Sequence, residues 1–216
     1  MSFTDLVAQL PQSSFRWAGA HSKAFLEKWL LETSVEEAPA GSLTHVTRTD
    51  PESGLKVTLH VRRFDDFRAV EWVVEFQNGG RTDTPIIEHI ELLDISIPVP
   101  RGEMLRLHHA NGSSCRMDDF LPLTTALPPN TQKAFSPHGG RSSNGAFPFM
   151  NLQRDGCGLV LAIGWSGQCA LVKSRWDWPC PPKRAQVLSQ YLGRCFTVGQ
   201  TDVCRTSMRL GLDPRA

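Results

Sequence analysis

Apolar and polar residues alternate along the middle of the chain in the pattern of a half-buried strand. Between residues 55 and 62 the apolar positions are odd-numbered and the polar positions are even-numbered: Leu55, Val57, Leu59 and Val61 against Lys56, Thr58, His60 and Arg62. Side chains of a strand point to opposite faces in turn, so one face of this segment is buried. Residues 50–54, Asp-Pro-Glu-Ser-Gly, have the composition of a turn. We therefore predict a hairpin that pairs residues 43–49 with residues 55–64.

Two further segments next to this hairpin also have strand-like patterns. Residues 70–77 alternate and end at Asn78-Gly79-Gly80. Residues 86–97 form a long run that is rich in β-branched residues, apolar on both faces and stopped by Pro98. A strand that is buried on both faces has this composition. Nearer the start of the chain, residues 22–35 predict a short helical turn followed by a strand, and residues 3–10 predict a short amphipathic helix.

The stretch from residue 141 to residue 168 combines polar turns with aromatic and apolar runs. Turn-forming pairs at Asn144-Gly145 and Asp155-Gly156 bracket an apolar strand at 147–152, and a second strand covers 159–165. We predict a core hairpin here. Residues 113–140 contain several prolines and are predicted to form a long loop, which in a compact domain is usually functional or mobile.

The composition supports an all-β fold. The chain has 216 residues with 40% hydrophobic content, enough for one substantial core. Its 17 glycines and 15 prolines are spread between short apolar runs, as in an antiparallel β-sandwich. We predict a sandwich domain over residues 1–172. Residues 173–216 alternate weakly and are rich in cysteine and proline, so they predict an atypical, irregular C-terminal tail.

Charge and cysteine spacing exclude several classes of function. The net charge of +1 gives no reason to expect nucleic acid or an anionic membrane as a partner. The chain has no run of about 20 apolar residues, and its first residues do not resemble a secretory signal, so a cytoplasmic protein is expected. The six cysteines include no pair with the usual zinc or redox spacing. We predict reduced thiols, no metal and no cofactor.

Several residues and motifs invite a chemical interpretation. His108 and His109 are adjacent on a predicted strand, so they face opposite ways and do not share a metal. Residues 164–168 miss the last glycine of a serine-hydrolase elbow and are not followed by a helix. The Asp118-Asp119 pair is either a solvated loop or a contact to a cation or to sugar hydroxyls. Trp165 is either a rim residue of the core or a platform for a sugar ring.

Three blocks of the sequence, in order, resemble a known family. They are residues 60–98 (HVRRFDDFRAVEWVVEFQNGGRTDTPIIEHIELLDISIP), 107–123 (LHHANGSSCRMDDFLPL) and 142–168 (SSNGAFPFMNLQRDGCGLVLAIGWSGQ). They resemble the N-terminal β-supersandwich region of family 36 glycoside hydrolases, the α-galactosidase (melibiase) group, over residues 15–171. The resemblance implies a galactose-mutarotase-like sandwich. In that family a (β/α)₈ barrel carries both catalytic aspartates, and a barrel needs about 250 residues that this sequence does not provide.

The resemblance implies a non-catalytic domain that packs on a barrel and is inactive alone. The alternative is a free-standing carbohydrate-binding or scaffold module. Either way, an α-galactoside or another carbohydrate is the expected ligand, bound weakly or indirectly. The loop residues of the matching blocks are the candidates for contacts to substrate or barrel: Asp118, Asp119, Ser143, Asn144 and Trp165.

Two further expectations concern the parts of the chain that do not fit an intact enzyme. Without a barrel, the face of the sandwich that would pack on it is exposed to solvent. We therefore expect self-association as a homo-oligomer, with residues 86–97 as the first apolar segment to examine. Residues 173–216 depart from the family, so we expect a truncated or frame-shifted coding sequence.

Overall fold

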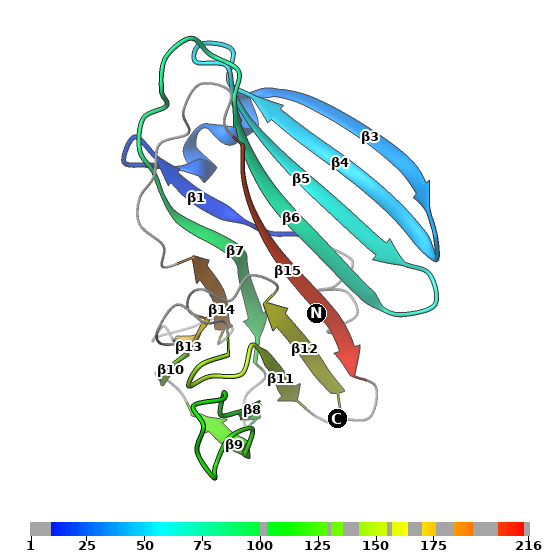
Figure 1. The fold of residues 1–216 in the computed structure, drawn as a ribbon, viewed down its shortest axis with the longest axis vertical. Coiled ribbons are helices and arrows are strands. Elements are labelled where there is room, and N and C mark those ends of the chain that lie inside the picture. Colours follow the sequence, from blue (N-terminus) through cyan, green and yellow to red (C-terminus); the bar gives the residue numbers. More distant parts are fainter. Residues whose placement is uncertain are drawn as a thin grey trace.

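The chain folds into two antiparallel sheets. The computed structural model describes residues 10–99, 103–128, 131–135, 143–154 and 157–163, and the backbone course of three later strands. One sheet has nine strands in the order β3-β4-β5-β6-β15-β12-β11-β8-β9 and the other has six in the order β10-β13-β14-β7-β1-β2. Figure 1 shows the larger sheet as a long, twisted layer with β3 and β9 at its two edges.

The strands of the larger sheet are β3 (Leu30–Ala38), β4 (Gly41–Thr49), β5 (Leu55–Phe64), β6 (Ala69–Asn78), β8 (Leu105–Ala110), β9 (Pro122–Leu127), β11 (Phe149–Arg154), β12 (Cys157–Ile163) and β15 (Val203–Asp213). Those of the smaller sheet are β1 (Ser14–Trp17), β2 (Ala20–His21), β7 (Ile87–Pro98), β10 (Gln132–Phe135), β13 (Ala170–Arg175) and β14 (Arg184–Tyr191). The all-β antiparallel sandwich predicted from the alternation is confirmed.

The predicted hairpin between β4 and β5 forms around a turn whose chemistry is visible. Thr49 pairs with Lys56 across the turn. The Asp50 carboxylate accepts hydrogen bonds from the backbone N–H and the hydroxyl of Ser53, at 2.9 and 2.6 Å. Gly54 takes a φ of +75°, which a residue with a side chain rarely adopts. The turn residues therefore fix the register of the hairpin.

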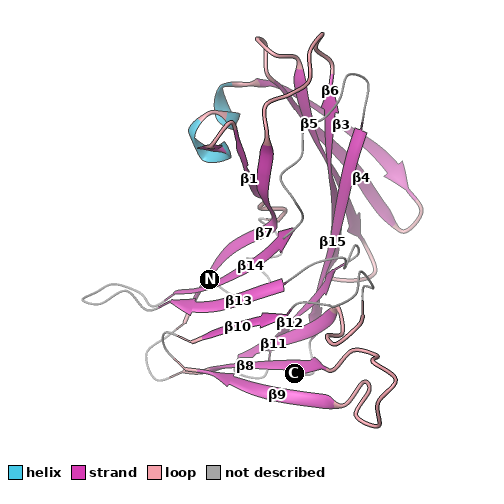
Figure 2. Ribbon diagram, turned by 60° about the vertical axis from the view of Figure 1, so that its left-hand side comes forward, coloured by secondary structure: helices cyan, strands magenta, loops and turns pink. Residues whose placement is uncertain are grey.

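The core lies between the two sheets, where β6 faces β7. Trp72 and Phe76 of β6 are fully buried, as are Leu93 and Ile95 of β7. The indole Nε1–H of Trp72 donates to the backbone carbonyl of Leu92 at 2.9 Å, so the largest core side chain also ties the two layers together. Figure 2 shows β1 and β7 in one layer and β4, β5 and β6 in the other.

Two short 3₁₀ turns close the end of the core near β1. They cover Ser22–Ala24 and Leu26–Lys28 and precede β3, as the predicted helical turn and strand require. Phe25 and Trp29, the residues that follow each turn, meet the aromatic residues of β1 edge to face, with Trp17 at 5.4 Å from Trp29 between ring centroids. Within the described ranges, no helix has the length and apolarity that a membrane crossing demands. The helix predicted for residues 3–10 lies outside the described residues, except for Leu10.

The prediction that residues 86–97 expose an apolar face is wrong. Strand β7 is central in its sheet, between β14 and β1, and every apolar residue from Ile87 to Ile97 is buried. The chain itself therefore buries the apolar side chains of β7, and the exposed apolar residue of this segment is Ile86, just before the strand.

The prediction of an irregular tail is wrong for two segments. Strand β15 lies in the middle of the larger sheet and pairs with β6 on one side and β12 on the other. Strand β14 pairs with β7 and β13. Residues from this region thus complete both sheets. The expected frame shift stays a prediction, which resequencing of the coding DNA would test.

The prediction of one long loop over residues 113–140 is wrong in part. Strand β9 pairs with β8 at the edge of the larger sheet, and β10 pairs with β13 at the edge of the smaller sheet. Pro122 begins β9. Proline has no backbone N–H to donate to a neighbouring strand, so the first residue of an edge strand is a position that tolerates it. The loop that remains before β9 covers residues 111–121.

Candidate functional site

The contact loop, residues 111–121, joins β8 to β9 at one end of the molecule. Both ribbon views place it at the end opposite the turn between β4 and β5 (Figures 1 and 2). Its two stems are held together by the hydrogen bond from the Asn111 N–H to the Leu121 carbonyl, at 3.2 Å. Within it, Cys115 and Phe120 take positive φ values of 60° and 58°. A loop with such backbone needs internal contacts to hold it.

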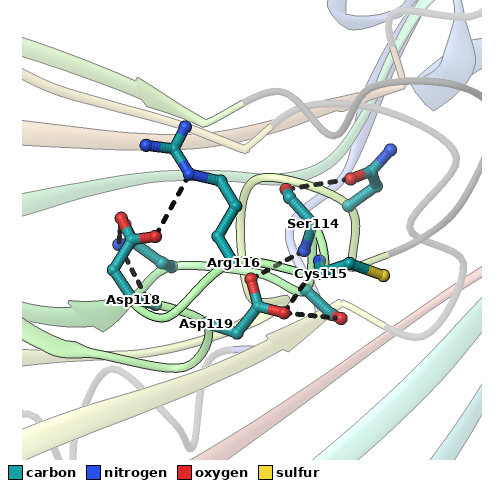
Figure 3. Close-up of polar contacts among 8 residues, drawn as sticks. Ser114, Cys115, Arg116, Asp118 and Asp119 are labelled. Carbon is teal, nitrogen blue, oxygen red and sulfur yellow. Dashed lines mark hydrogen bonds and ion pairs between the residues drawn. The ribbon is translucent and has the colours of Figure 1, made fainter.

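The Asp119 carboxylate supplies those contacts. It accepts hydrogen bonds from the backbone N–H of Ser114 at 2.7 Å, the N–H of Cys115 at 2.9 Å and the hydroxyl of Ser113 at 3.1 Å (Figure 3). These donors favour the charged form and lower the pKa of Asp119, with the Ser114 N–H as the largest cause. Asp119 is therefore an anchor of the loop, and most of its acceptor capacity is already used.

Asp118 points to a different set of partners. Its carboxylate lies 3.3 Å from the Arg116 Nε and accepts a hydrogen bond from the Asn111 side-chain amide at 3.2 Å. Arg116 and Asp118 are exposed, so their ion pair contributes little to stability. The two adjacent aspartates do not converge on one point, and paired acid–base chemistry is not built here.

The segment just before β11 packs directly on the contact loop. The Ser113 N–H donates to the Ser143 carbonyl at 2.7 Å, and the Ser114 hydroxyl donates to the Asn144 side-chain oxygen at 3.1 Å. Gly112 is buried at this crossing, where an added Cβ would overlap the Ser143 carbonyl oxygen. Gly145 turns the segment with a φ of +83°. The structure thus brings four of the predicted site residues together: Asp118, Asp119, Ser143 and Asn144.

The sequence analysis missed a set of exposed apolar side chains on the same segments as these polar residues and on the strands next to them. The apolar patch consists of exposed side chains on the contact loop and on the starts of β9 and β11: Met117, Phe120, Leu121, Leu123 and Phe149. Met117 is fully exposed and Phe120 is 53% exposed. The Phe147 ring joins Phe120 at 5.6 Å and Phe149 at 5.2 Å between centroids. The signal was present in the sequence as apolar residues within a polar loop.

A cavity of about 340 Å³ opens beside the contact loop. It lies where β8 and β9 meet β10, and its walls include Asn111, His109, Lys133 and Phe135. The Lys133 ammonium lies over the Phe135 ring, 5.6 Å from its centroid. Burial, followed by the charges of Lys133 and His108, lowers the pKa of His109, so this imidazole is neutral at pH 7. The size is that of a small-molecule site.

The two adjacent histidines of β8 point to opposite faces of the sheet. His109 is buried and its Nε2 lies 2.9 Å from the Thr125 hydroxyl, whereas His108 lies on the opposite face, 2.6 Å from the Gln153 side-chain oxygen. The prediction that the two histidines face opposite ways is confirmed. Trp165 and the Gly164–Gln168 motif lie outside the described residues.

Comparison by sequence gives no assignment. No protein-family model matches the chain, and no curated protein matches it.

Comparison by structure identifies the fold. The chain is similar to an α-galactosidase from Lactobacillus brevis, with a TM-score of 0.65 and 14% identity over 95% of this chain and 29% of that one. It is similar to the GH36 α-galactosidase from Geobacillus stearothermophilus, with a TM-score of 0.64 and 12% identity over 96% and 30%. It also resembles an Escherichia coli K12 protein provisionally named an aldose 1-epimerase, with a TM-score of 0.54 and 10% identity over 93% and 78%. The chain therefore spans about a third of the length of the α-galactosidases it matches.

Proposed function

We propose that the chain is a non-catalytic sandwich domain of an α-galactosidase-like glycoside hydrolase, and that it packs on a catalytic barrel. The observation that carries the proposal is the mismatch of lengths: nearly all of this chain corresponds to less than a third of an α-galactosidase. The three sequence blocks that resemble the family support the same assignment. In that family the barrel carries the catalytic aspartates, so this chain supports catalysis without performing it.

The apolar patch is the surface that we assign to the barrel. Exposed apolar patches mark protein–protein contacts or ligand-binding grooves, and the first of these fits a domain that packs on a barrel. The side chains of Met117 and Phe120, on the contact loop, are both exposed in the described part of the chain. Covering them removes apolar area from water, which contributes roughly 25 cal/mol per Å².

The polar residues of the site then have a positioning role. Asp119 fixes the loop that carries Met117 and Phe120. Ser143 and Asn144, in the segment before β11, accept hydrogen bonds that hold this loop in place. The exposed Asp118 carboxylate remains the group best placed to contact substrate or barrel. We propose the same contact to substrate or barrel for Trp165, on the basis of the sequence alone.

An activity assay tests the proposal. We expect the pure chain to show no turnover of a chromogenic α-galactoside, because the catalytic aspartates of the family belong to the barrel. An intact family 36 α-galactosidase, assayed in parallel, controls for substrate and conditions. Turnover that copurifies with the chain through several columns would rule the proposal out.

A free-standing carbohydrate-binding module is the second candidate, and two observations favour it. The cavity beside the contact loop has a suitable size and combines an aromatic ring with polar groups. The resemblance to the Escherichia coli protein covers most of that protein's length, so the fold also occurs as nearly a whole chain. Calorimetry with galactose and raffinose separates the candidates. Saturable binding that is lost in Phe135→Ala supports the module, and absence of binding supports the barrel-dependent domain.

A further inference from the structure

A row of ionisable side chains crosses four neighbouring strands on the outer face of the larger sheet. His45 of β4 and His60 of β5 are direct cross-strand partners, and their Nδ1 atoms lie 2.7 Å apart. At the two ends of the row, the His45 Nε2 lies 3.9 Å from a Glu36 oxygen and the His60 Nε2 lies 3.3 Å from a Glu75 oxygen. The opposite face of β5 carries buried core residues, so the row is separate from the core.

The hydrogen-bonding capacity of imidazole makes this arrangement unusual. A neutral imidazole carries a proton on only one of its two ring nitrogens. A carboxylate accepts hydrogen bonds, so Glu75, at 3.3 Å, favours the proton on the Nε2 of His60. The Glu36 carboxylate lies 3.9 Å from the His45 Nε2, beyond hydrogen-bonding distance, and acts on that ring only through its charge. The Nδ1 of His60 then presents a lone pair toward the Nδ1 of His45. At this distance the space between the two nitrogens holds either a proton on the His45 Nδ1 or, when the rings move apart slightly, a metal ion.

We propose that His45 and His60 bind a divalent late transition-metal ion through their Nδ1 atoms. Metal-bound histidines usually donate their other ring N–H to a carboxylate, which orients the ring. Glu75 occupies this outer position on His60 at 3.3 Å, and the Glu36 carboxylate lies 3.9 Å from the corresponding nitrogen of His45. Imidazole ligands suit Cu²⁺, Ni²⁺ and Zn²⁺, and do not suit Ca²⁺ or Mg²⁺.

The geometry requires only a small adjustment of the two rings. Zinc–nitrogen bonds of about 2.0–2.1 Å at a tetrahedral angle place the two nitrogens about 3.3 Å apart. The rings therefore move apart by roughly half an ångström from the ion-free spacing, which side-chain rotation on a sheet surface accommodates. No set of three or more His, Cys, Asp or Glu side chains is arranged around an ion in the part of the chain that is described. The site is accordingly bidentate, with water completing the coordination.

The neighbouring groups on the same face do not block an ion. Thr47 and Thr58 form the next cross-strand pair, with their hydroxyl oxygens 3.0 Å apart, and offer neutral oxygens to bound water. Arg62 follows His60 on this face, but its guanidinium donates to the Pro39 carbonyl at 2.9 Å and lies over the Phe64 ring. The two carboxylates make the row net negative, which favours a cation.

Calorimetric titration of the tag-free chain with Ni²⁺ at neutral pH tests the site. We expect one saturable site per chain, weakened at least about 10-fold in His45→Gln and in His60→Gln. Glu75→Gln keeps both ligands and removes the outer carboxylate, so we expect about a 10- to 100-fold loss of affinity. His108→Gln is the matched control, because His108 lies on the same sheet away from the row, and it leaves binding unchanged. The exposed thiols of Cys115 and Cys157 are present in every variant and cancel in the comparison.

Thermal unfolding with and without Ni²⁺ provides a readout that does not depend on calorimetry. Binding to the native state raises the melting temperature, with a stabilisation that grows as the logarithm of the free ion concentration, so the wild type and His108→Gln shift upward with Ni²⁺. The two row variants fold but lose most of that shift. The proposal is overturned if the wild type binds no Ni²⁺. That result is expected if His45 and His60 only form a hydrogen bond between their Nδ1 atoms. It is also overturned if both His45→Gln and His60→Gln bind as tightly as the wild type.

Discussion

Replacing Trp72 by alanine is expected to lower the free energy of unfolding by about 3–5 kcal/mol. Trp72 is fully buried between the two sheets, and its truncation leaves a large cavity in the region where β6 faces β7. The Leu92 carbonyl also loses the indole N–H that it accepts at 2.9 Å. Native domains are stable by only about 5–15 kcal/mol, so this single change removes a large share of the total.

Urea unfolding followed by far-UV circular dichroism measures this effect. Trp72→Phe keeps most of the apolar volume and removes the hydrogen bond together with a small part of the ring, so we expect a smaller cost of about 1–3 kcal/mol. Phe67→Ala is the matched control: Phe67 is 70% exposed, and its truncation changes stability by no more than about 0.5 kcal/mol. A Trp72→Ala variant as stable as the control would contradict the packing described for the core.

Replacing Gly112 by alanine is expected to cost about 1–3 kcal/mol through overpacking at the crossing of two backbone segments. The new Cβ would overlap the Ser143 carbonyl and approach the Ala146 nitrogen to 2.7 Å, and both neighbours are backbone atoms that cannot rotate away. The hydrogen bond from the Ser113 N–H to the Ser143 carbonyl is lost. The contact loop then shifts together with Met117 and Phe120.

Hydrogen exchange at the amides of Ser113, Ser114 and Cys115 reports this shift directly. We expect faster exchange at all three in Gly112→Ala, because their carbonyl and carboxylate acceptors move away. Ser114→Ala is the matched control: it removes only the hydroxyl that contacts Asn144 and keeps the backbone crossing. Unchanged protection in Gly112→Ala would show that the loop is not held by this crossing.

The strands of the first hundred residues follow from the sequence because their alternation is strict and their turns contain the required residues. The hairpin around Asp50 and Gly54 is an example, since both the face and the register are set locally. The long apolar strand β7 was also recognised as buried on both faces. The expectation of an exposed face was wrong because the alternation of one strand does not show how much of the chain packs over it. The sequence also does not reveal that β14, from a distant part of the chain, pairs with its edge.

The errors of the sequence analysis share a physical cause, which is pairing between distant segments. Strand β15 contains an alternating run in which Met208, Leu210 and Leu212 share one parity. The surrounding cysteines and prolines concealed it, and only its pairing with β6 and β12 identifies it. Strands β9 and β10 are short edge strands, for which local pattern is weak.

The candidate site was only partly accessible from sequence. The family resemblance selected Asp118, Asp119, Ser143 and Asn144, and the structure brings their segments into contact. It did not distinguish the anchoring role of Asp119 from that of a ligand, because the three donors to its carboxylate come from a backbone conformation with positive φ at Cys115. The apolar patch was missed because apolar residues in a loop carry no periodic signal.

The central claim is that this chain is the sandwich domain of a barrel-containing hydrolase, and the DNA that follows codon 216 tests it most directly. Sequencing should cover the coding region and the next kilobase in all reading frames. The account predicts eight strand–helix units with an aspartate at the end of at least two of the strands, either in frame or after a frame shift. A stop codon followed only by sequence without barrel units would contradict the claim and favour the free-standing module.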